Sequence, residues 1–298
     1  MNTYLQHKHP AIQLFFILGT AFLLSQVGTI VASVVTNLLL GVDKFTAFNI
    51  LGGYTKHPEA RLIIIVFQIM QFLFLFLATT LIIGYYTSEQ PLQYLGLNTL
   101  APATYFTKAL LLVLLSLVAM GMFGLINSYI PLPKSMLATE ALQNEAIKNI
   151  ALSNTIYQLI ASIIVVGLFA AIGEELFFRA MLQPIFIKWT GKSWLGILII
   201  AIIFSAIHMQ FSGFLPRLAL GLVLGYLYYY SRSIWVTIFF HFLFNTIQLV
   251  IVFNKPEQLT KTSPISGQNF IIILLGCLST AAILYLFSRM ATYKSANN

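Results

Sequence analysis

Long apolar runs with very few charges inside them restrict what this sequence can fold into. The chain has 298 residues, of which 59% are hydrophobic and 8% are charged, whereas a soluble domain carries about 25% charged residues. So few charges cannot cover a water-facing surface, and most of the surface must therefore face lipid. Only helices and closed barrels satisfy all backbone polar groups in lipid. The runs are continuous rather than alternating as in barrel strands, which predicts an all-α, polytopic membrane helical bundle.

The predicted spans number about eight, each near the roughly 20 apolar residues that a helix needs to cross the hydrocarbon core. We expect them at residues 11–40, 62–86, 109–130, 156–176 with a helical continuation toward 189, 194–210, 214–230, 234–253 and 270–287. Residues 133–150 are polar with spaced apolar positions and predict an amphipathic helix at the membrane interface. Residues 254–269 are polar with turn residues and predict a loop. One membrane domain over residues 1–298 is the simplest organisation.

The excess of basic residues does not indicate nucleic-acid binding. Sixteen lysines and arginines against eight acidic residues give a net charge of +8. They stand singly between apolar runs, whereas a nucleic-acid binder gathers them on one face. This pattern is typical of loop charges at the level of the lipid headgroups. The one cysteine, Cys277, lies in an apolar run and cannot form an intrachain disulfide.

Ionisable residues within the apolar runs are the strongest pointer to function, because each costs at least about 2.5–3.5 kcal/mol near the membrane centre. Among the acidic residues only Glu174 and Glu175 lie at the end of an apolar run. Among the histidines only His208 and His241 lie within predicted spans. Arg179 completes the set, which contains the residue types that hydrolysis needs.

The spacing around the glutamates predicts two different roles for them. Glu175 and Arg179 are four residues apart, so an α-helix would bring them together as a neutralising pair. Glu174 lies about 100° around the helix from Glu175 and can face a cavity.

The same four-residue spacing occurs twice more. His241 and Asn245 would present an imidazole and an amide on one helix face. Phe204 and His208 would place an aromatic ring one turn from the second imidazole. We therefore expect each of these two segments to present a pair of side chains on one face of its helix.

These three motifs together resemble those of the CPBP family, which includes the CAAX prenyl endopeptidases and the bacterial Abi self-immunity proteins. The motifs are EExxxR at Glu174, Glu175 and Arg179, FxxxH at Phe204 and His208, and HxxxN at His241 and Asn245. Each motif alone is weak evidence for the family, but the order and the spacing of all three match those of the CPBP family. The resemblance covers about residues 150–250, and the first 130 residues match only in being hydrophobic. It implies an eight-helix membrane bundle with a catalytic core at about 150–250.

The resemblance also implies a mechanism and a type of substrate. It assigns water activation to Glu174 with His208, oxyanion stabilisation to His241 and Asn245, and a supporting role to Glu175, Arg179 and Phe204. The protein would be a glutamic-type intramembrane endopeptidase without a cofactor. Its partners would be the lipid bilayer and a peptide or membrane-protein substrate, lipidated or not, in CAAX-like processing or bacteriocin self-immunity. Because the chain is compact and lacks long soluble appendages, we expect it in a bacterial plasma membrane.

Three alternatives accompany this interpretation. Glu174, His208 and His241 would make a three-ligand zinc site with an open position, although no HExxH motif supports it. A proton-coupled transporter also uses buried glutamate and histidine, but would favour inverted repeats that the sequence does not show. In a non-catalytic membrane partner, the histidines would form only helix–helix hydrogen bonds and Glu175–Arg179 only a salt bridge.

Overall fold

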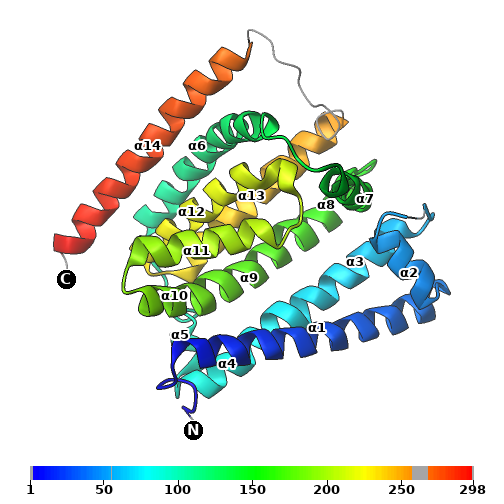
Figure 1. Cartoon of the computed structure of the whole chain (residues 1–298), viewed down its shortest axis with the longest axis horizontal. Coiled ribbons are helices and arrows are strands. Elements are labelled where there is room, and N and C mark those ends of the chain that lie inside the picture. The colour runs from blue at the N-terminus through cyan, green and yellow to red at the C-terminus, as the bar shows by residue number, and fades with distance from the viewer. Residues whose placement is uncertain (1–2, 55, 257–267, 297–298) are drawn as a thin grey trace. The chain divides into compact units, whose positions relative to one another are not determined.

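The computed structural model describes residues 3–54, 56–256 and 268–296, and within these ranges the backbone contains helices and no strand (Figure 1). Seven helical stretches there are long and apolar enough to cross a membrane. They are α1 (Pro10–Leu40), α3–η1–α4 (Ala60–Thr87), α6 (Ala103–Ser128), α8 to α10 (Ile156–Thr190), η4–α12 (Phe211–Ser231), α13 (Ile234–Asn254) and the Phe270–Ala291 part of α14 (Gln268–Ala296). The predicted helical bundle is confirmed.

Two of the predicted segments need correction. The segment expected at 194–210 is the 14-residue helix α11, Ser193–Ala206, which at about 1.5 Å per residue falls short of the roughly 30 Å hydrocarbon core. The third span begins at Ala103 instead of residue 109. Lys108 therefore lies inside this helix, with its ammonium 5.2 Å from the ring centre of Tyr105, a distance at which a cation and an aromatic ring attract each other.

Two connecting segments were also predicted. The helix expected at 133–150 is present as α7, Lys134–Ala151. The loop expected at 254–269 falls largely outside the described residues. The short helices α2 (Lys44–Leu51) and α5 (Pro91–Tyr94) complete the connections.

The chain divides into two compact units. Unit 1 comprises Met1–Pro91, Pro133–Phe177 and Asn245–Lys261, and unit 2 comprises Leu92–Leu132, Phe178–Phe244 and Thr262–Asn298. Among the described residues, three of the boundaries fall inside helices, after Pro91, after Phe177 and after Phe244. The expectation of a single domain over the whole chain stays a prediction.

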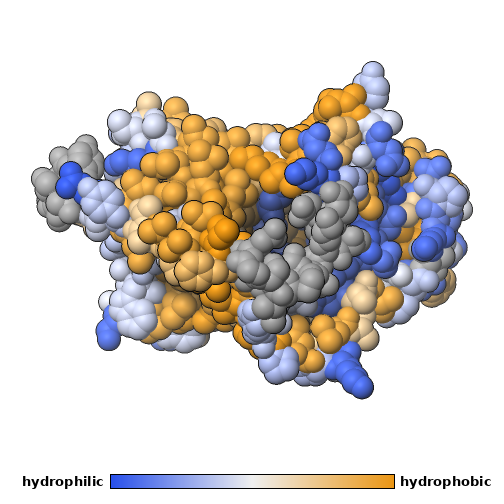
Figure 2. Space-filling view, turned by 90° about the horizontal axis from the view of Figure 1, so that it is seen from above, coloured by the Kyte–Doolittle hydropathy of each residue, from blue (hydrophilic) through white to orange (hydrophobic). Residues whose placement is uncertain are grey.

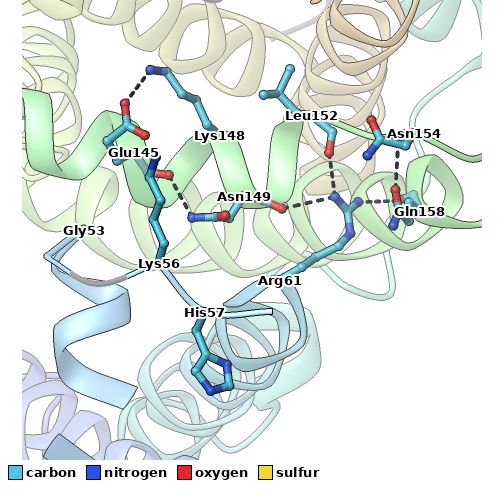
Figure 3. A pocket seen from close by; sticks show the side chains of 10 residues that line it. All are labelled: Gly53, Lys56, His57, Arg61, Glu145, Lys148, Asn149, Leu152, Asn154 and Gln158. Carbon is cyan, nitrogen blue, oxygen red and sulfur yellow. Dashed lines mark hydrogen bonds and ion pairs between the residues drawn. The ribbon is translucent and has the colours of Figure 1, made fainter. Parts of the chain in front are cut away.

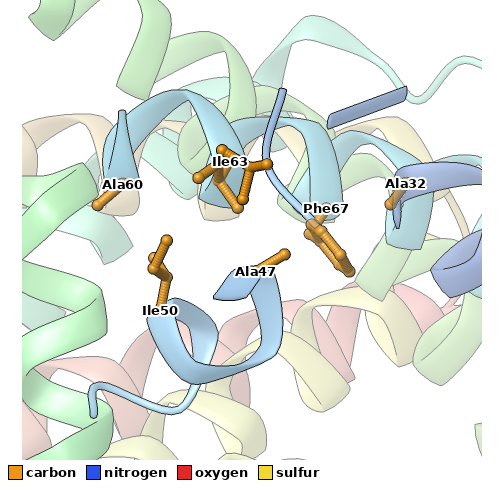
Figure 4. Packing of buried hydrophobic residues seen from close by; sticks show 7 residues of the cluster. Ala32, Ala47, Ile50, Ala60, Ile63 and Phe67 are labelled. Atoms are coloured by element: carbon orange, nitrogen blue, oxygen red, sulfur yellow. The ribbon is translucent and has the colours of Figure 1, made fainter. Parts of the chain in front are cut away.

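Unit 1 has an apolar cluster in which α1, α2 and α3 pack together, and this cluster holds the connection between α1 and α3 (Figure 4). Ile50 of α2 and Ile63 of α3 are fully buried in it. Helix α2 begins where it does because Asp43 caps it, with its carboxylate accepting from the backbone N–H groups of Phe45 and Thr46. The hydrogen bond from the Thr46 hydroxyl is the main reason that the pKa of Asp43 lies below its usual value.

Arg61, at the start of α3, joins α3 to the end of α7 and the start of α8. Its guanidinium donates five hydrogen bonds, at 2.5–3.1 Å. The acceptors are the carbonyl oxygens of Asn149, Leu152 and Gln158 and the hydroxyls of Ser153 and Ser162. A cation at the carboxyl end of a helix also suits the helix dipole.

We expect Arg61→Lys to destabilise the purified protein by at least about 2 kcal/mol, because hydrogen bonds from a charged donor are worth about 1.5–3 kcal/mol each and an ammonium cannot reproduce the guanidinium fork. Thermal unfolding in detergent measures the change, with the exposed Arg289→Lys as the control. Equal unfolding temperatures for the two variants would show that the five bonds contribute nothing net.

In unit 2, α14 packs along α6, and α12 packs against both α6 and α11. Close approach of α14 to α6 depends on Gly276, where a side chain would overlap Met122. Gln183 of α10 (Gln183–Thr190) is 1% exposed and donates to the carbonyl of Gly225 in α12, at 3.0 Å. These contacts hold α11, the helix that carries Phe204 of the FxxxH motif.

Many large apolar side chains point outward from the helices. Phe15 and Leu38 of α1 are 74% and 78% exposed, and Leu284 of α14 is 65% exposed. Figure 2 shows hydrophobic side chains over much of the visible surface. Because a water-soluble monomer rarely exposes large contiguous apolar areas, this chain is an integral membrane protein.

Candidate active site

The seven predicted site residues divide between the two units. Arg179, Phe204, His208 and His241 belong to unit 2. The remaining three, Glu174, Glu175 and Asn245, belong to unit 1.

Phe204 is the centre of the unit 2 group. Its ring is 1% exposed and lies 5.2 Å from the His208 ring and 6.2 Å from the His241 ring, both edge-on. The guanidinium carbon of Arg179 lies 5.0 Å from the Phe204 ring centre, and Phe178 packs edge-on against the same ring at 5.4 Å. One aromatic side chain therefore contacts both imidazoles and the buried cation. The FxxxH spacing had predicted only the contact of Phe204 with His208.

His208 lies in a turn just beyond the end of α11 and not within a span as predicted. Its Nδ1 is 2.7 Å from the carbonyl oxygen of Phe204, one of the carbonyls that a helix end leaves without a backbone partner. A carbonyl oxygen only accepts, so this bond places the proton on Nδ1 and makes Nε2 the acceptor of the neutral imidazole. The FxxxH spacing thus fixes the tautomer of the histidine.

The turn that carries His208 is held from both sides. Asn127 of α6, 3% exposed, donates to the carbonyl of Phe211 at 3.0 Å and accepts from the N–H of Leu215 at 2.8 Å. The Ser205 hydroxyl donates to the Phe214 carbonyl at 2.7 Å. Within the turn, Met209 adopts a φ of 54°, which is uncommon for a residue other than glycine. The connection is therefore constrained, and His208 with it.

The glutamates lie on a helix that is not uniformly α. It runs through α8 (Ile156–Ser162), η2 (Ile163–Phe169), α9 (Ala170–Glu174), η3 (Glu175–Leu182) and α10, and η2 and η3 are π-helical. Glu174 closes the α-helical piece and is partly buried, whereas Glu175 opens η3 and is fully buried. The α-helical phase expected between Glu175 and Arg179 is therefore wrong, because η3 bonds i→i+5, a geometry found frequently at functional sites. The predicted contact of the two side chains stays a prediction.

A seam of small and aromatic residues fixes the glutamate helix against η1 (Gln71–Ala78). Phe169 stacks on Phe72 at 4.7 Å, and Phe177 packs edge-on against Phe76 at 5.7 Å. Between them, Gly173 leaves no room for a β-carbon, which would lie 2.9 Å from the β-carbon of Phe76. The position of Glu174 is therefore set by the residue directly before it.

Asn245 makes an interhelical hydrogen bond in unit 1. Its Nδ2 donates to the carbonyl oxygen of Val166, in the π-helical stretch η2, at 3.0 Å. An amide nitrogen carries two N–H donors, so this bond orients the side chain and uses one of them.

Several residues that position the site were not predicted from the sequence. Gly173 carries a signal, because an isolated glycine in a helical run often marks a close helix contact. Asn127 and Val166 carry none, since an asparagine in a predicted span is ambiguous and a backbone carbonyl has no sequence signature. Only the fold identifies them.

Comparison with known families matches residues 156–247 to the model of the type II CAAX prenyl endopeptidase Rce1-like family. All three motifs, from Glu174 to Asn245, lie inside the matched range. The similarity to this family therefore covers about a third of the chain. No curated protein and no solved structure is found similar to the chain. The matched range is similar to the CAAX-type membrane proteases, and this similarity agrees with the resemblance to the CPBP family.

Proposed function

We propose that the protein is a glutamic-type intramembrane endopeptidase that hydrolyses a peptide bond with water activated by Glu174 and His208. The observation that supports this most is the Rce1-like match, because it contains every motif residue. The contact of Phe204 with both histidine rings supports it independently.

Water activation needs an acceptor for a proton. Glu174 takes a proton from the water as its oxygen attacks the carbonyl carbon of the scissile bond. His208 Nε2, the acceptor set by the Nδ1 bond to Phe204, orients that water. The proton then passes to the leaving amine as the C–N bond breaks. A positioned general base of this kind typically contributes about 10²–10⁴-fold.

The tetrahedral intermediate carries a negative oxygen that needs donors. His241, 3% exposed, supplies an imidazole N–H, and Asn245 supplies the amide N–H that Val166 does not take. Each such donor in a dry site is worth about 2.7–4 kcal/mol in the transition state. Glu175, Arg179 and Phe204 hold this architecture.

The substrate in this proposal is a peptide or membrane protein that reaches the site from the bilayer, with a prenylated CAAX-like peptide as the first candidate. The chain would act in a bacterial plasma membrane, in peptide processing or in bacteriocin self-immunity. A peptide that already carries a lipid would partition into the membrane beside the site.

The test is proteolysis by the purified full-length protein in detergent, with farnesylated and unmodified CAAX peptides and mass-spectrometric detection. We expect cleavage that a chelator does not inhibit, because Glu174 and not a metal ion supplies the base. Folded protein that cleaves neither peptide would favour the transporter or the non-catalytic partner. Zinc bound stoichiometrically and lost together with activity would favour the zinc site of Glu174, His208 and His241.

For Asn245→Ala we expect a fall in kcat of about 10²-fold, with little change in KM, because an oxyanion donor acts mainly in the transition state. The lost bond to Val166 should lower stability by only about 0.6 kcal/mol, the average for interhelical hydrogen bonds in a membrane. Asn254→Ala is the matched control, since Asn254 lies on the same helix, is exposed and donates to the carbonyl of Val250 one turn earlier. If Asn245→Ala kept full turnover but was strongly destabilised, the role of Asn245 would be to hydrogen-bond two helices together and not to stabilise the oxyanion.

A further inference from the structure

Unit 1 contains a pocket that the proposed chemistry does not use (Figure 3). Its volume is about 570 Å³. The residues that line it come from the connection after α2, the start of α3, the end of α7 and the start of α8. From the sequence, its charged residues were predicted only to lie at the level of the lipid headgroups.

The pocket carries an excess of positive charge. Lys56, Arg61 and Lys148 line it, and Glu145 is the only acidic residue among the residues that line it. Counting three cations against one carboxylate gives a net charge of +2 with His57 neutral. A concave surface of one charge sign concentrates ligands of the opposite sign.

Glu145 cannot neutralise this excess. It accepts a hydrogen bond from the Lys148 ammonium at 2.6 Å, and this bond is the main reason that its pKa is lowered, with Lys56 adding a smaller effect. Arg61 directs its hydrogen bonds to neutral oxygens only, so its charge is not met by a carboxylate among the described residues. Two cationic charges thus remain for a ligand.

The pocket lies where two membrane spans begin. Arg61 is the second residue of the span Ala60–Thr87, and Gln158 is the third of the span Ile156–Thr190. Helix α7, which supplies Glu145 and Lys148, is not among the candidate spans. Residues at the end of a span lie at the level of the lipid headgroups, which is where anionic phosphates are found in a bilayer.

We infer that this pocket binds a phosphate group, supplied by the headgroup of an anionic phospholipid. Lys56 and Arg61 carry the charge that Glu145 does not meet, and the ammonium groups of Lys56 and Lys148 are the donors for the phosphate. The Arg61 network fixes the wall behind it. Asn154, which also lines the pocket, adds an amide suited to headgroup hydroxyls. The site is separate from the proposed hydrolysis, so that failure of one proposal leaves the other standing.

The test titrates phosphatidylglycerol into the purified full-length protein in neutral detergent and follows the unfolding temperature. Phosphatidylcholine and inorganic phosphate are titrated in parallel. We expect saturable stabilisation by phosphatidylglycerol and little by phosphatidylcholine. If inorganic phosphate stabilised the protein equally well, the phosphate ligand would come from solution and the lipid assignment would be wrong. Stabilisation by phosphatidylglycerol alone would support a lipid headgroup as the ligand.

Variants then locate the binding. In Lys56→Gln/Lys148→Gln we expect at least about tenfold weaker binding, since a basic residue near an anionic membrane contributes about fivefold. Glu145→Gln should strengthen binding, an effect of opposite sign that a structural role would not produce. Lys134→Gln removes the same charge from the exposed start of α7, outside the pocket, and should leave binding unchanged.

The inference fails if the double variant binds phosphatidylglycerol as tightly as the wild type. It also fails if Lys134→Gln weakens binding as much as the double variant, because the effect would then belong to general surface charge. Arg61 is not varied here, since its hydrogen bonds hold the pocket wall itself.

Discussion

Glu174→Gln should reduce kcat/KM for peptide cleavage by at least about 100-fold and leave the unfolding temperature unchanged. Glutamine keeps the shape of the side chain but cannot take a proton, and a general base contributes about 10²–10⁴-fold. The fold should survive because the seam that fixes this helix is made by Phe169, Gly173 and Phe177, and Glu174 itself is only partly buried.

Glu89→Gln is the matched control, because Glu89 is an exposed carboxylate in a connection between helices. Initial rates on the prenylated peptide and thermal unfolding of the same preparations give both readouts. Activity of Glu174→Gln within about tenfold of the wild type would remove Glu174 from the base role. A large fall in unfolding temperature would show that it is structural.

Arg179→Ala should cause the largest loss of stability. Arg179 is fully buried, and its guanidinium lies over the rings of Phe178 and Phe204, at 6.0 and 5.0 Å from the ring centres. Such cation–π contacts are worth about 2 kcal/mol when desolvated. If Arg179 also compensates the buried Glu175, its removal leaves a buried charge unpaired, at about 3–5 kcal/mol. Yield and unfolding temperature in detergent measure the loss.

A double-mutant cycle with Glu175→Gln and Arg179→Met isolates the pairing. If the two charges compensate each other, the double variant should be less destabilised than the sum of the single variants by about 0.5–3 kcal/mol. Additive effects would mean that Arg179 is held by the aromatic rings and not by Glu175. Arg179→Lys should not restore stability, because an ammonium lacks the planar guanidinium that stacks on those rings.

The sequence by itself determined that the protein is a helical membrane protein, and it also supplied the candidate residues for the proposed chemistry. Span positions followed from local hydrophobicity, because a run of about 20 apolar residues has the length and composition to cross the hydrocarbon core of a bilayer as a helix. The ionisable candidates followed from the high cost of charge in lipid, which leaves few such positions to consider. Phe204 and Asn245 followed from their four-residue spacing to the two histidines.

The tertiary structure decided everything that depends on which helices meet. Whether residues 175–182 become α or π depends on packing and not on apolar spacing, so the phase between Glu175 and Arg179 was mispredicted. His208 lies outside α11, in a connection whose next residues bond to Asn127, more than 80 positions earlier: Asn127 and Phe211 are 84 residues apart. The phosphate pocket joins Arg61 to a carbonyl 91 residues away. Contacts at such separations leave no local pattern, so only the packed fold could reveal them.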